Sequence, residues 1–205
     1  MTEELAPRGD RARGEILQAA HRLFVERGFH GTSVRQIAQE AGIALGGIYN
    51  HFSRKDDLFE AVLLNHHPYS QVLPAMKAAE GDNLADFMHD AARRMVAGLE
   101  GHPDFLNLMF IELVEFRGRH VPLIFATVYP DVLIFAQRFQ EQPGQLRPIP
   151  LPILLRAFLG LFFSYVMTEL LMGGQMPEAM RKGALDYFVD IFLHGILIPE
   201  PVVKD

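Results

Sequence analysis

Apolar residues recur every three or four positions along most of this chain, from about residue 10 to residue 197. That interval is the period of a helix that buries one face. No stretch of useful length alternates between apolar and polar residues, as a half-buried strand does. The sequence therefore predicts an all-α fold. The predicted helices span residues 10–27, 33–41, 44–52, 83–100, 103–118, 120–142, 151–172 and 177–197, with a further helix after residue 53.

Capping residues mark the ends of the first helices. Asp10 and Ser53 stand where they would cap helix N-termini. Ser33, followed by Gln36 three residues later, forms a capping-box pattern. Gly28 suits the left-handed conformation that ends many helices. Helices are therefore expected to begin near residues 10, 33 and 53, and the first to end before Gly28.

Two prolines interrupt the helix that follows Ser53. Pro68 and Pro74 each lack the amide hydrogen that a helix interior needs, and the proline ring clashes with the preceding turn. This region is predicted to be a connector.

The segment 151–172 is long and apolar enough to be tested as a membrane span. It contains Arg156 and Glu169, which are unfavourable in a bilayer, and no positively charged segment adjoins it. The helix 177–197 is also apolar on most sides. We expect both helices to be buried in a bundle or a subunit interface, with no membrane partner.

Composition narrows the class of protein. The 205 residues include no cysteine, so disulfides and thiolate metal sites are excluded. The N-terminus lacks the apolar core of a signal peptide, and a cytoplasmic location is expected. Residues 8–55 hold eight Lys and Arg against four acids, a surplus of four positive charges, so with a net charge of −6 the remainder carries −10. The asymmetry suggests an anionic partner for the first part, with ordinary surface-charge variation as the alternative.

Two predicted helices near the N-terminus are joined by a very short turn. The helices 33–41 and 44–52 are separated by Gly42 and Ile43, and the helix 10–27 precedes them. A supporting helix followed by two helices with a glycine-containing turn is the arrangement of a helix-turn-helix. Other helical proteins contain such pairs as well, so the arrangement alone leaves the function open.

The residue pattern of this region resembles the N-terminal DNA-binding domain of the TetR family of transcriptional regulators. The resemblance extends from Arg13 to Leu63. It implies a helix-turn-helix DNA-binding domain over residues 10–65 and a helical effector-binding and dimerisation domain over residues 66–200. The matching positions are Ala20, Phe24, Gly28, Thr32, Ser33, Ile37, Ala38, Ala41, Gly42, Gly46, Tyr49, Phe52, Lys55 and Leu58.

The resemblance also implies which residues bind DNA. Thr32 and Ser33 place hydroxyls and amides at a helix N-terminus, which suits a phosphate, although helix capping is the alternative. Tyr49 is implied as a phosphate contact, with a place in the core as the alternative. Arg11 and Arg13 are candidates to reach DNA from a flexible arm. The implied DNA-binding residues are Thr32, Ser33, Arg35, Gln36, Ala44, Leu45, Gly46, Gly47, Tyr49, Asn50, His51 and Lys55.

The third helix departs from the family pattern. Many members have a serine-like cap and a lysine where this chain has Ala44 and Leu45, and a threonine, serine or alanine in place of Gly47. Ala44 and Leu45 are then left to contact thymine methyl groups, and Asn50 to pair with adenine. Gly46 and Gly47 each cost a helix roughly 1 kcal/mol relative to alanine. Close approach of the backbone to the groove is the expected reason for both.

The remainder of the chain resembles the family in helical architecture. The resemblance implies a homodimer, formed through the helices 151–172 and 177–197, that binds a palindromic operator in double-stranded DNA. It further implies a repressor that a small, hydrophobic effector releases. Sixteen Phe and nine Met residues suit a large apolar pocket, although a place in the core explains each of them individually. The implied pocket residues are Phe105, Met109, Glu112, Glu115, Phe116, His120, Phe125, Phe162 and Met167.

Two acidic residues lie within the apolar segment LMFIELVEF. A buried carboxylate needs a partner. The candidate partners of Glu112 and Glu115 are Arg119, His120 and Arg156, which would make a structural pair. The alternative partner is a cationic or hydrogen-bonding ligand.

The sequence predicts neither an enzyme nor a cofactor. It has no glycine-rich phosphate loop, no cysteine nucleophile and no recognisable Ser-His-Asp motif. His66 and His67 are adjacent, and neighbours on a helix point about 100° apart, so they form a poor metal pair. The pair Glu112 and Glu115 lacks the Glu-x-x-His companions of a di-iron bundle. The alternative to a regulator is an all-α dimeric scaffold or binding protein without sequence-specific DNA binding.

Overall fold

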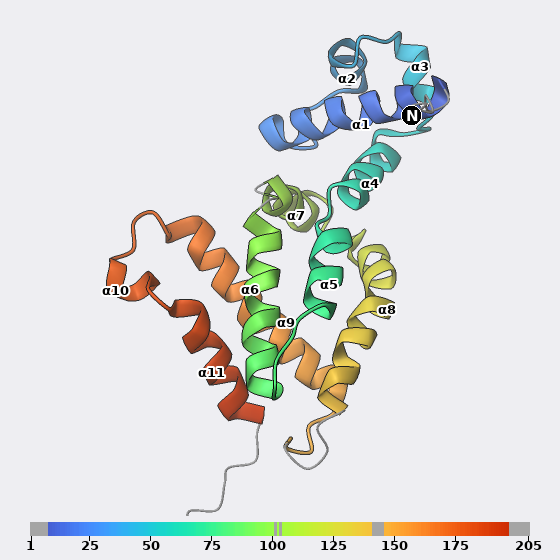
Figure 1. Ribbon diagram of the computed structural model, residues 1–205. Helices are drawn as coiled ribbons and strands as arrows, with labels where there is room; N and C mark the ends of the chain where they lie inside the picture. The colour runs from blue at the N-terminus through green and yellow to red at the C-terminus, as the bar shows by residue number, and fades with distance from the viewer. Residues whose placement is uncertain (1–7, 101, 103, 141–145, 197–205) are drawn as a thin grey trace, which may run out of the picture. The chain divides into compact units, whose positions relative to one another are not determined.

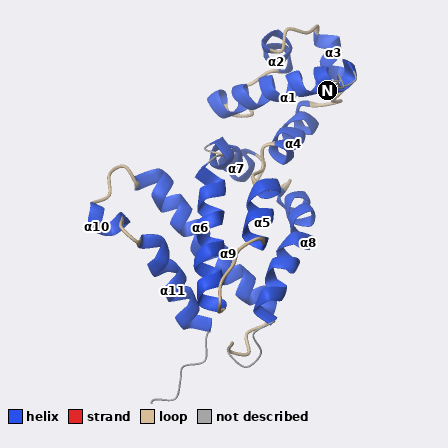
Figure 2. Ribbon diagram, viewed as in Figure 1, coloured by secondary structure: helices blue, strands red, loops and turns tan. Residues whose placement is uncertain are grey.

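The computed structural model describes residues 8–100, 102, 104–140 and 146–196, and every regular element in these residues is a helix, as Figure 1 and Figure 2 show. The prediction of an all-α fold is confirmed. The helices are α1 (Arg8–Arg27), α2 (Val34–Glu40), α3 (Leu45–Tyr49), α4 (Lys55–Asn65), α5 (Tyr69–Lys77), α6 (Leu84–Glu100), α7 (Asp104–Glu115), α8 (Val121–Gln140), α9 (Leu151–Met172), α10 (Glu178–Arg181) and α11 (Ala184–Ile196).

The helices are divided between two compact units. Unit 1 contains the described residues up to Pro68 together with 102 and 104–127, that is, α1 to α4, α7 and the start of α8. Unit 2 contains residues 69–100, 128–140 and 146–196. The predicted DNA-binding segment 10–65 lies inside unit 1, whereas the predicted effector segment 66–200 is shared between the units. The functional domain boundaries stay a prediction.

Unit 1 has an aromatic core that joins α7 to the helix-turn-helix region. The ring of Phe59 in α4 lies edge-on to Phe24 in α1, with centroids 5.4 Å apart. Phe116, which directly follows α7, stacks on Phe59 at 4.6 Å and meets Phe29 at 4.4 Å. Because these rings are buried together, α7 and the N-terminal helices share one hydrophobic core.

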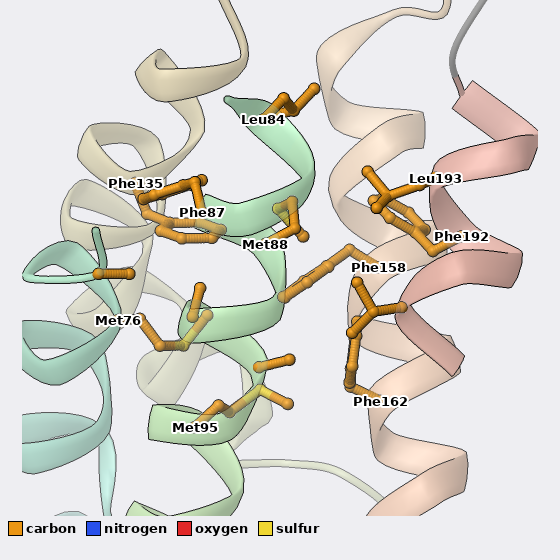
Figure 3. Packing of buried hydrophobic residues seen from close by; sticks show 14 of the residues in the cluster. Met76, Leu84, Phe87, Met88, Met95, Phe135, Phe158, Phe162, Phe192 and Leu193 are labelled. Carbon is orange, nitrogen blue, oxygen red and sulfur yellow. The ribbon is translucent and has the colours of Figure 1, made fainter. Parts of the chain in front are cut away.

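Unit 2 is built around α6. Figure 3 shows the side chains of Met88 and Met95 on this helix, with Met76 and Phe135 on one side and Phe158 on the other. Long apolar side chains thus cover one face of α6, and their removal from water supplies the main stabilisation of the unit. The buried cluster comprises Val72, Met76, Ala79, Leu84, Phe87, Met88, Ala91, Ala92, Met95, Phe135, Leu154, Phe158, Phe162, Val189, Phe192, Leu193 and Ile196.

Several predicted helix ends are confirmed. The Ser33 hydroxyl accepts a hydrogen bond from the Gln36 amide at 3.2 Å, and the Ser33 amide donates to the Gln36 side chain at 2.8 Å, so the capping box is present. Gly28 has a φ of +72° and follows the last residue of α1. The break at Pro68 is also present, because α4 ends at Asn65 and α5 begins at Tyr69.

Other predicted helix ends are wrong. Asp10 lies within the first turn of α1, and the N-cap of α4 is Arg54, without a side-chain hydrogen bond, in place of Ser53. Pro74 lies inside α5, where burial of neighbouring apolar side chains offsets the missing amide bond. The helix predicted over 177–197 is split at Gly183, whose φ is +69°. The predicted helix ends at residues 142 and 197 and the start at residue 103 lie outside the described residues.

Candidate nucleic-acid interface

The turn before α2 is held by the hydroxyl of Thr32. This hydroxyl donates to the backbone oxygens of Leu23 and Gly28 at 3.0 and 2.9 Å, and Thr32 is almost fully buried. Ser33 is exposed, and its hydroxyl takes part in the capping box. Both residues therefore have the capping and turn-stabilising roles that the sequence left open, and their contact with phosphate stays a prediction.

The short helix α3 has one buried face and one exposed face. Ile48 and Phe52 are 1% and 6% exposed, and they anchor the helix as the spacing predicts. Leu45 and Tyr49 are 43% and 53% exposed, and Asn50 is exposed too. Because the Tyr49 ring is largely in solvent, the alternative that places it in the core is wrong. The outer face of α3 is thus available for a partner.

The helix α3 is also shorter than predicted. It spans Leu45–Tyr49 where the sequence predicts 44–52, and its N-cap, Ala44, provides no side-chain hydrogen bond. Two interior glycines and the missing cap both weaken a helix. The chain continues from Asn50 as turns, with the amide of Phe52 donating to the Ile48 oxygen at 2.9 Å.

Arginine side chains lie on α1 and α2. Arg11 and Arg13 lie on α1, so the expectation of a flexible arm at these positions is wrong. The Arg13 guanidinium lies 5.3 Å from the centre of the Phe52 ring, and Arg11 pairs with Glu15 at 3.1 Å. Arg35 is exposed on α2. Arg13 beside Phe52 and Arg35 on α2, the helix that packs with α3, favour an anionic partner for this part of unit 1.

Lys55 ties the start of α4 to the turn before α2. Its ammonium donates to the backbone oxygens of Phe29 and Thr32 at 2.8 and 2.7 Å, and lies 4.0 Å from the centre of the Phe29 ring. Burial lowers the pKa of Lys55, and the carboxylates of Glu115 and Asp56 oppose that change. An ammonium has three N–H donors, so one is left for a DNA phosphate. The predicted phosphate contact stays a prediction.

Glu115 at the end of α7 binds the turn after α1. Its carboxylate accepts hydrogen bonds from the backbone amides of Phe29 and His30 at 3.0 and 2.8 Å. A Cβ added to Gly28 would lie 2.8 Å from Glu115 Oε1. Sequence reasoning considered only side chains and ligands as partners for this carboxylate. The glycine at position 28, whose left-handed φ turns the following amides away from α1, was the available signal.

Glu112 forms the structural pair that the sequence offered as one alternative. It is fully buried, and it accepts from the backbone amide of His120 at 2.6 Å and contacts His120 Nδ1 at 2.7 Å. Arg119 instead pairs with Asp56 at 2.9 Å, and Arg156 is an exposed residue of unit 2. The carboxylate of Glu112 is therefore satisfied within unit 1.

The residues predicted to line an effector pocket are distributed over both units. Glu112, Phe116 and His120 contact one another in the core of unit 1, whereas Phe125 is exposed on α8. Phe105, Met109 and Glu115 are partly buried in unit 1, and Phe162 and Met167 belong to unit 2. A depression on unit 2 is polar and open, in contrast to the apolar pocket expected; it is lined by Glu80, Asp86, His89, Asp90, Arg93 and Arg94. The apolar effector pocket stays a prediction.

The adjacent histidines face different neighbours. His66 stacks on His21, whereas the His67 ring meets Phe105 edge-on at 4.6 Å. Within the described residues, no group of three or more His, Asp or Glu side chains is arranged to hold a metal ion.

The helix α9 is long and apolar enough to cross a membrane by length and hydropathy, and no other helix of the described chain meets both conditions. Only 22% of its most apolar window is buried. Its exposed apolar side chains include Leu159 and Phe163.

Comparison with known proteins agrees with the geometry of α2 and α3. Residues 16–62 match the family model described as bacterial regulatory proteins of the tetR family. UidR of Escherichia coli, an HTH-type transcriptional regulator, is 30% identical over 154 residues, which cover 72% of this chain and 76% of UidR. YvkB of Bacillus subtilis, an uncharacterized HTH-type transcriptional regulator, is 25% identical over 187 residues, covering 88% and 95% of the two chains.

Solved structures have the same fold. Salmonella enterica GusR superposes with a TM-score of 0.69 at 21% identity, covering 95% of this chain and 97% of GusR. The shared helical architecture and the sequence matches point to one conclusion. The chain belongs to the TetR family of bacterial regulatory proteins and is a helix-turn-helix transcriptional regulator.

Proposed function

We propose that this regulator is a repressor that binds a palindromic operator as a homodimer and is released by a small, hydrophobic effector. The observation that carries the DNA-binding part is the outer face of α3, which exposes Leu45, Tyr49 and Asn50 while Ile48 anchors the helix. A recognition helix needs such a face because its side chains must reach base edges in the major groove.

The remaining DNA contacts are assigned by position. Ser33 and Arg35 are exposed at the start of α2, where free amides and a cation favour a phosphate. Tyr49 and His51 lie at the end of α3, and Lys55 retains one N–H donor. These groups position the protein on DNA, whereas Asn50 is the side chain suited to read adenine.

The homodimer is supported by exposed apolar surface on α9 and α11. Leu159 and Phe163 are about half exposed on α9, and Tyr187 and Ile191 are 68% and 64% exposed on α11. Apolar surface of this kind on a soluble chain marks an interface, and a second copy would bury it. A dimer also presents two copies of α3, which a palindromic site with half-sites about 34–36 Å apart requires. Burial in a dimer would also account for the apolar character of α9 without a membrane, in keeping with the proposed action on DNA in the cytoplasm.

The effector is proposed to bind apolar side chains. Half-buried Phe105 and Met109, which both lie on α7 in unit 1, support a hydrophobic ligand. Native mass spectrometry of the purified protein would detect a retained small molecule. Its addition to the protein–DNA complex should lower operator affinity. A retained molecule that leaves DNA affinity unchanged would contradict the effector role.

The decisive experiment selects duplexes from a random pool with the purified full-length chain. We expect a two-fold symmetric consensus, with affinity that falls steeply as salt rises, because phosphate contacts release counterions. Absence of binding to every duplex, or binding insensitive to salt, would contradict the regulator proposal and favour the all-α dimeric scaffold.

A further inference from the structure

The two adjacent glycines of α3 lie in different surroundings. A methyl group added to Gly46 would meet no atom within 4 Å. A methyl group added to Gly47 would lie 3.5 Å from Ile43 Cδ1, an ordinary van der Waals contact. Neither glycine is among the positive-φ glycines of the described chain, which are Gly28, Gly42, Gly118 and Gly183. The fold therefore accepts alanine at both positions.

At Gly28, also in unit 1, the reason for glycine is visible. Gly28 has a φ of +72° and would place a Cβ 2.8 Å from Glu115 Oε1. The helix α3, in contrast, has five residues and no side-chain cap. Each glycine costs such a helix roughly 1 kcal/mol relative to alanine. Nothing within unit 1 requires Gly46, which is also true of Gly14 in the long helix α1. What distinguishes Gly46 is its place on the exposed face of the short helix α3.

The surroundings of Gly46 describe the surface that α3 offers to a partner. Gly46 is exposed and lies one helical turn before Tyr49 and Asn50, beside the exposed Leu45. The sequence of α3, LGGIY, contains no charged side chain. Arginine and lysine are the side chains that most often read guanine, whereas aliphatic side chains contact the thymine methyl group. At Gly46 and Leu45 the outer face of α3 therefore carries no side chain and an aliphatic one, which suits contact with thymine.

We propose that Gly46 allows the α3 backbone to approach the major groove at a distance that a methyl group would prevent, and that Leu45 then contacts thymine 5-methyl groups. This inference rests on the proposed DNA-binding function. It departs from the sequence-based expectation that both glycines permit close approach. A methyl group at Gly47 would face Ile43 within the protein, whereas one at Gly46 would point into empty space, so only Gly46 has this role. Each operator half-site is accordingly expected to carry thymine opposite Leu45.

The first test compares Gly46→Ala with the matched control Gly47→Ala on the selected duplex. Both variants gain helix propensity, and a thermal melt should show both at least as stable as the original chain. Gly46→Ala should weaken binding by about tenfold or more, whereas Gly47→Ala should stay within about twofold. Unchanged or tighter binding by Gly46→Ala would overturn the inference. Equal losses in both variants would also overturn it, because lost helix flexibility would then be the cause.

The second test replaces single operator thymines with deoxyuridine, which removes the 5-methyl group and keeps the hydrogen-bonding edge. The original chain should lose several-fold in affinity at one or two positions. Leu45→Ala should bind the thymine duplex more weakly and should no longer distinguish the two bases. Equal affinity of the original chain for both duplexes, or discrimination that persists in Leu45→Ala, would overturn the methyl contact.

The outcomes separate this inference from the proposed function. If the original chain binds no duplex, both are overturned. If it binds a selected duplex with steep salt dependence and neither substitution matters, DNA binding holds and the roles of Gly46 and Leu45 are wrong.

Discussion

The imidazole rings of His21 in α1 and His66 at the end of α4 are stacked, with centroids 3.8 Å apart and planes 8° apart. The Nε2 atoms of both rings are buried and make no hydrogen bond within the described structure. Burial lowers the pKa of His21, opposed by Asp104, whose carboxylate lies 3.6 Å from His21 Nε2. Burial, followed by the neighbouring His21, lowers the pKa of His66 to about 4. The pair is therefore neutral near pH 7.

The free energy of unfolding should fall as the pH drops from about 6.5 towards 4. Over this range the unfolded chain binds protons at positions 21 and 66, with a pKa near 6.5, while the folded pair resists protonation. Folding stability from the pair is complete above about pH 6.5 and is lost below it. His66→Phe keeps a stacked ring and removes one titrating group. The melting temperature of this variant should fall by several degrees less than that of the original chain between about pH 7 and pH 5.

The control for this experiment is His194→Phe, because His194 is exposed at the end of α11. Its melting temperature should follow that of the original chain at every pH. Some acid sensitivity should remain in His66→Phe, since burial also lowers the pKa of His67 to about 4. If the melting temperatures of His66→Phe and the original chain fell in parallel with pH, the stacked pair would not be the source of the acid sensitivity.

Loss of the buried carboxylate at position 112 should strongly destabilise unit 1. Glu112→Ala leaves the buried amide and ring of His120 without their hydrogen-bond partner, and each buried polar group left unsatisfied costs about 1–3 kcal/mol. Urea unfolding measures the change. Glu26→Ala, at an exposed position of α1, is the control and should change stability by less than about 0.5 kcal/mol. A similarly small change in Glu112→Ala would contradict the importance of the pair.

Gly28→Ala should be more destabilising than Gly42→Ala. Both glycines have a left-handed φ, which costs an alanine roughly 1–2 kcal/mol, but only at Gly28 would the new Cβ approach Glu115, at 2.8 Å. Adding Glu115→Ala to Gly28→Ala should remove the clash between the new Cβ and the carboxylate, while the strain of the left-handed φ remains. Urea unfolding of the single and double variants gives the coupling energy. Additive effects would show that the carboxylate moves aside without cost.

Signals that lie close together in the sequence predict the local structure well. Ser33 and Gln36 are three residues apart, and their hydrogen bonds define the start of α2 without help from the rest of the fold. Ser53 fails as a cap because α4 begins at Lys55, one residue later than a cap at Ser53 requires. Pro74 fails as a helix breaker because the burial of Val72 and Met76 outweighs one missing amide bond. Local preference is thus overridden where tertiary burial is large.

Contacts between distant segments were beyond sequence reasoning. The Glu115 carboxylate meets the amides of Phe29 and His30 more than 80 residues earlier in the chain. The apolar residues around Glu115 in the sequence identified it as a carboxylate that needs a partner. The sequence does not show that this partner is the pair of backbone amides after α1. The roles of Lys55 and of the stacked His21 depend in the same way on how α1, α4 and α7 meet.

Substitutions on α3 should separate base reading from phosphate contact. Asn50→Ala should reduce discrimination among half-site variants, since an amide side chain pairs with adenine, at roughly 1–3 kcal/mol per good pair. Tyr49→Ala should weaken binding to all duplexes alike, because a phosphate contact carries no sequence information. Fluorescence anisotropy on a panel of single-base variants measures both. If Asn50→Ala left the preference unchanged, the assignment of this residue to base reading would be wrong.

The dimer should depend on the exposed apolar side chains of α9 and α11. Phe163→Glu on α9 and Ile191→Glu on α11 place a charge on the exposed apolar face, and burying an unpaired carboxylate in an interface is strongly unfavourable. Sedimentation velocity should therefore show monomers for both variants and a dimer for the original chain. Val114→Glu, at an exposed position on α7 outside the two predicted interface segments 151–172 and 177–197, is the control and should remain dimeric. Operator affinity should fall steeply in the monomeric variants, because the helix-turn-helix of a single subunit contacts only one half-site. Dimers that persist in both charged variants would place the subunit interface on another surface.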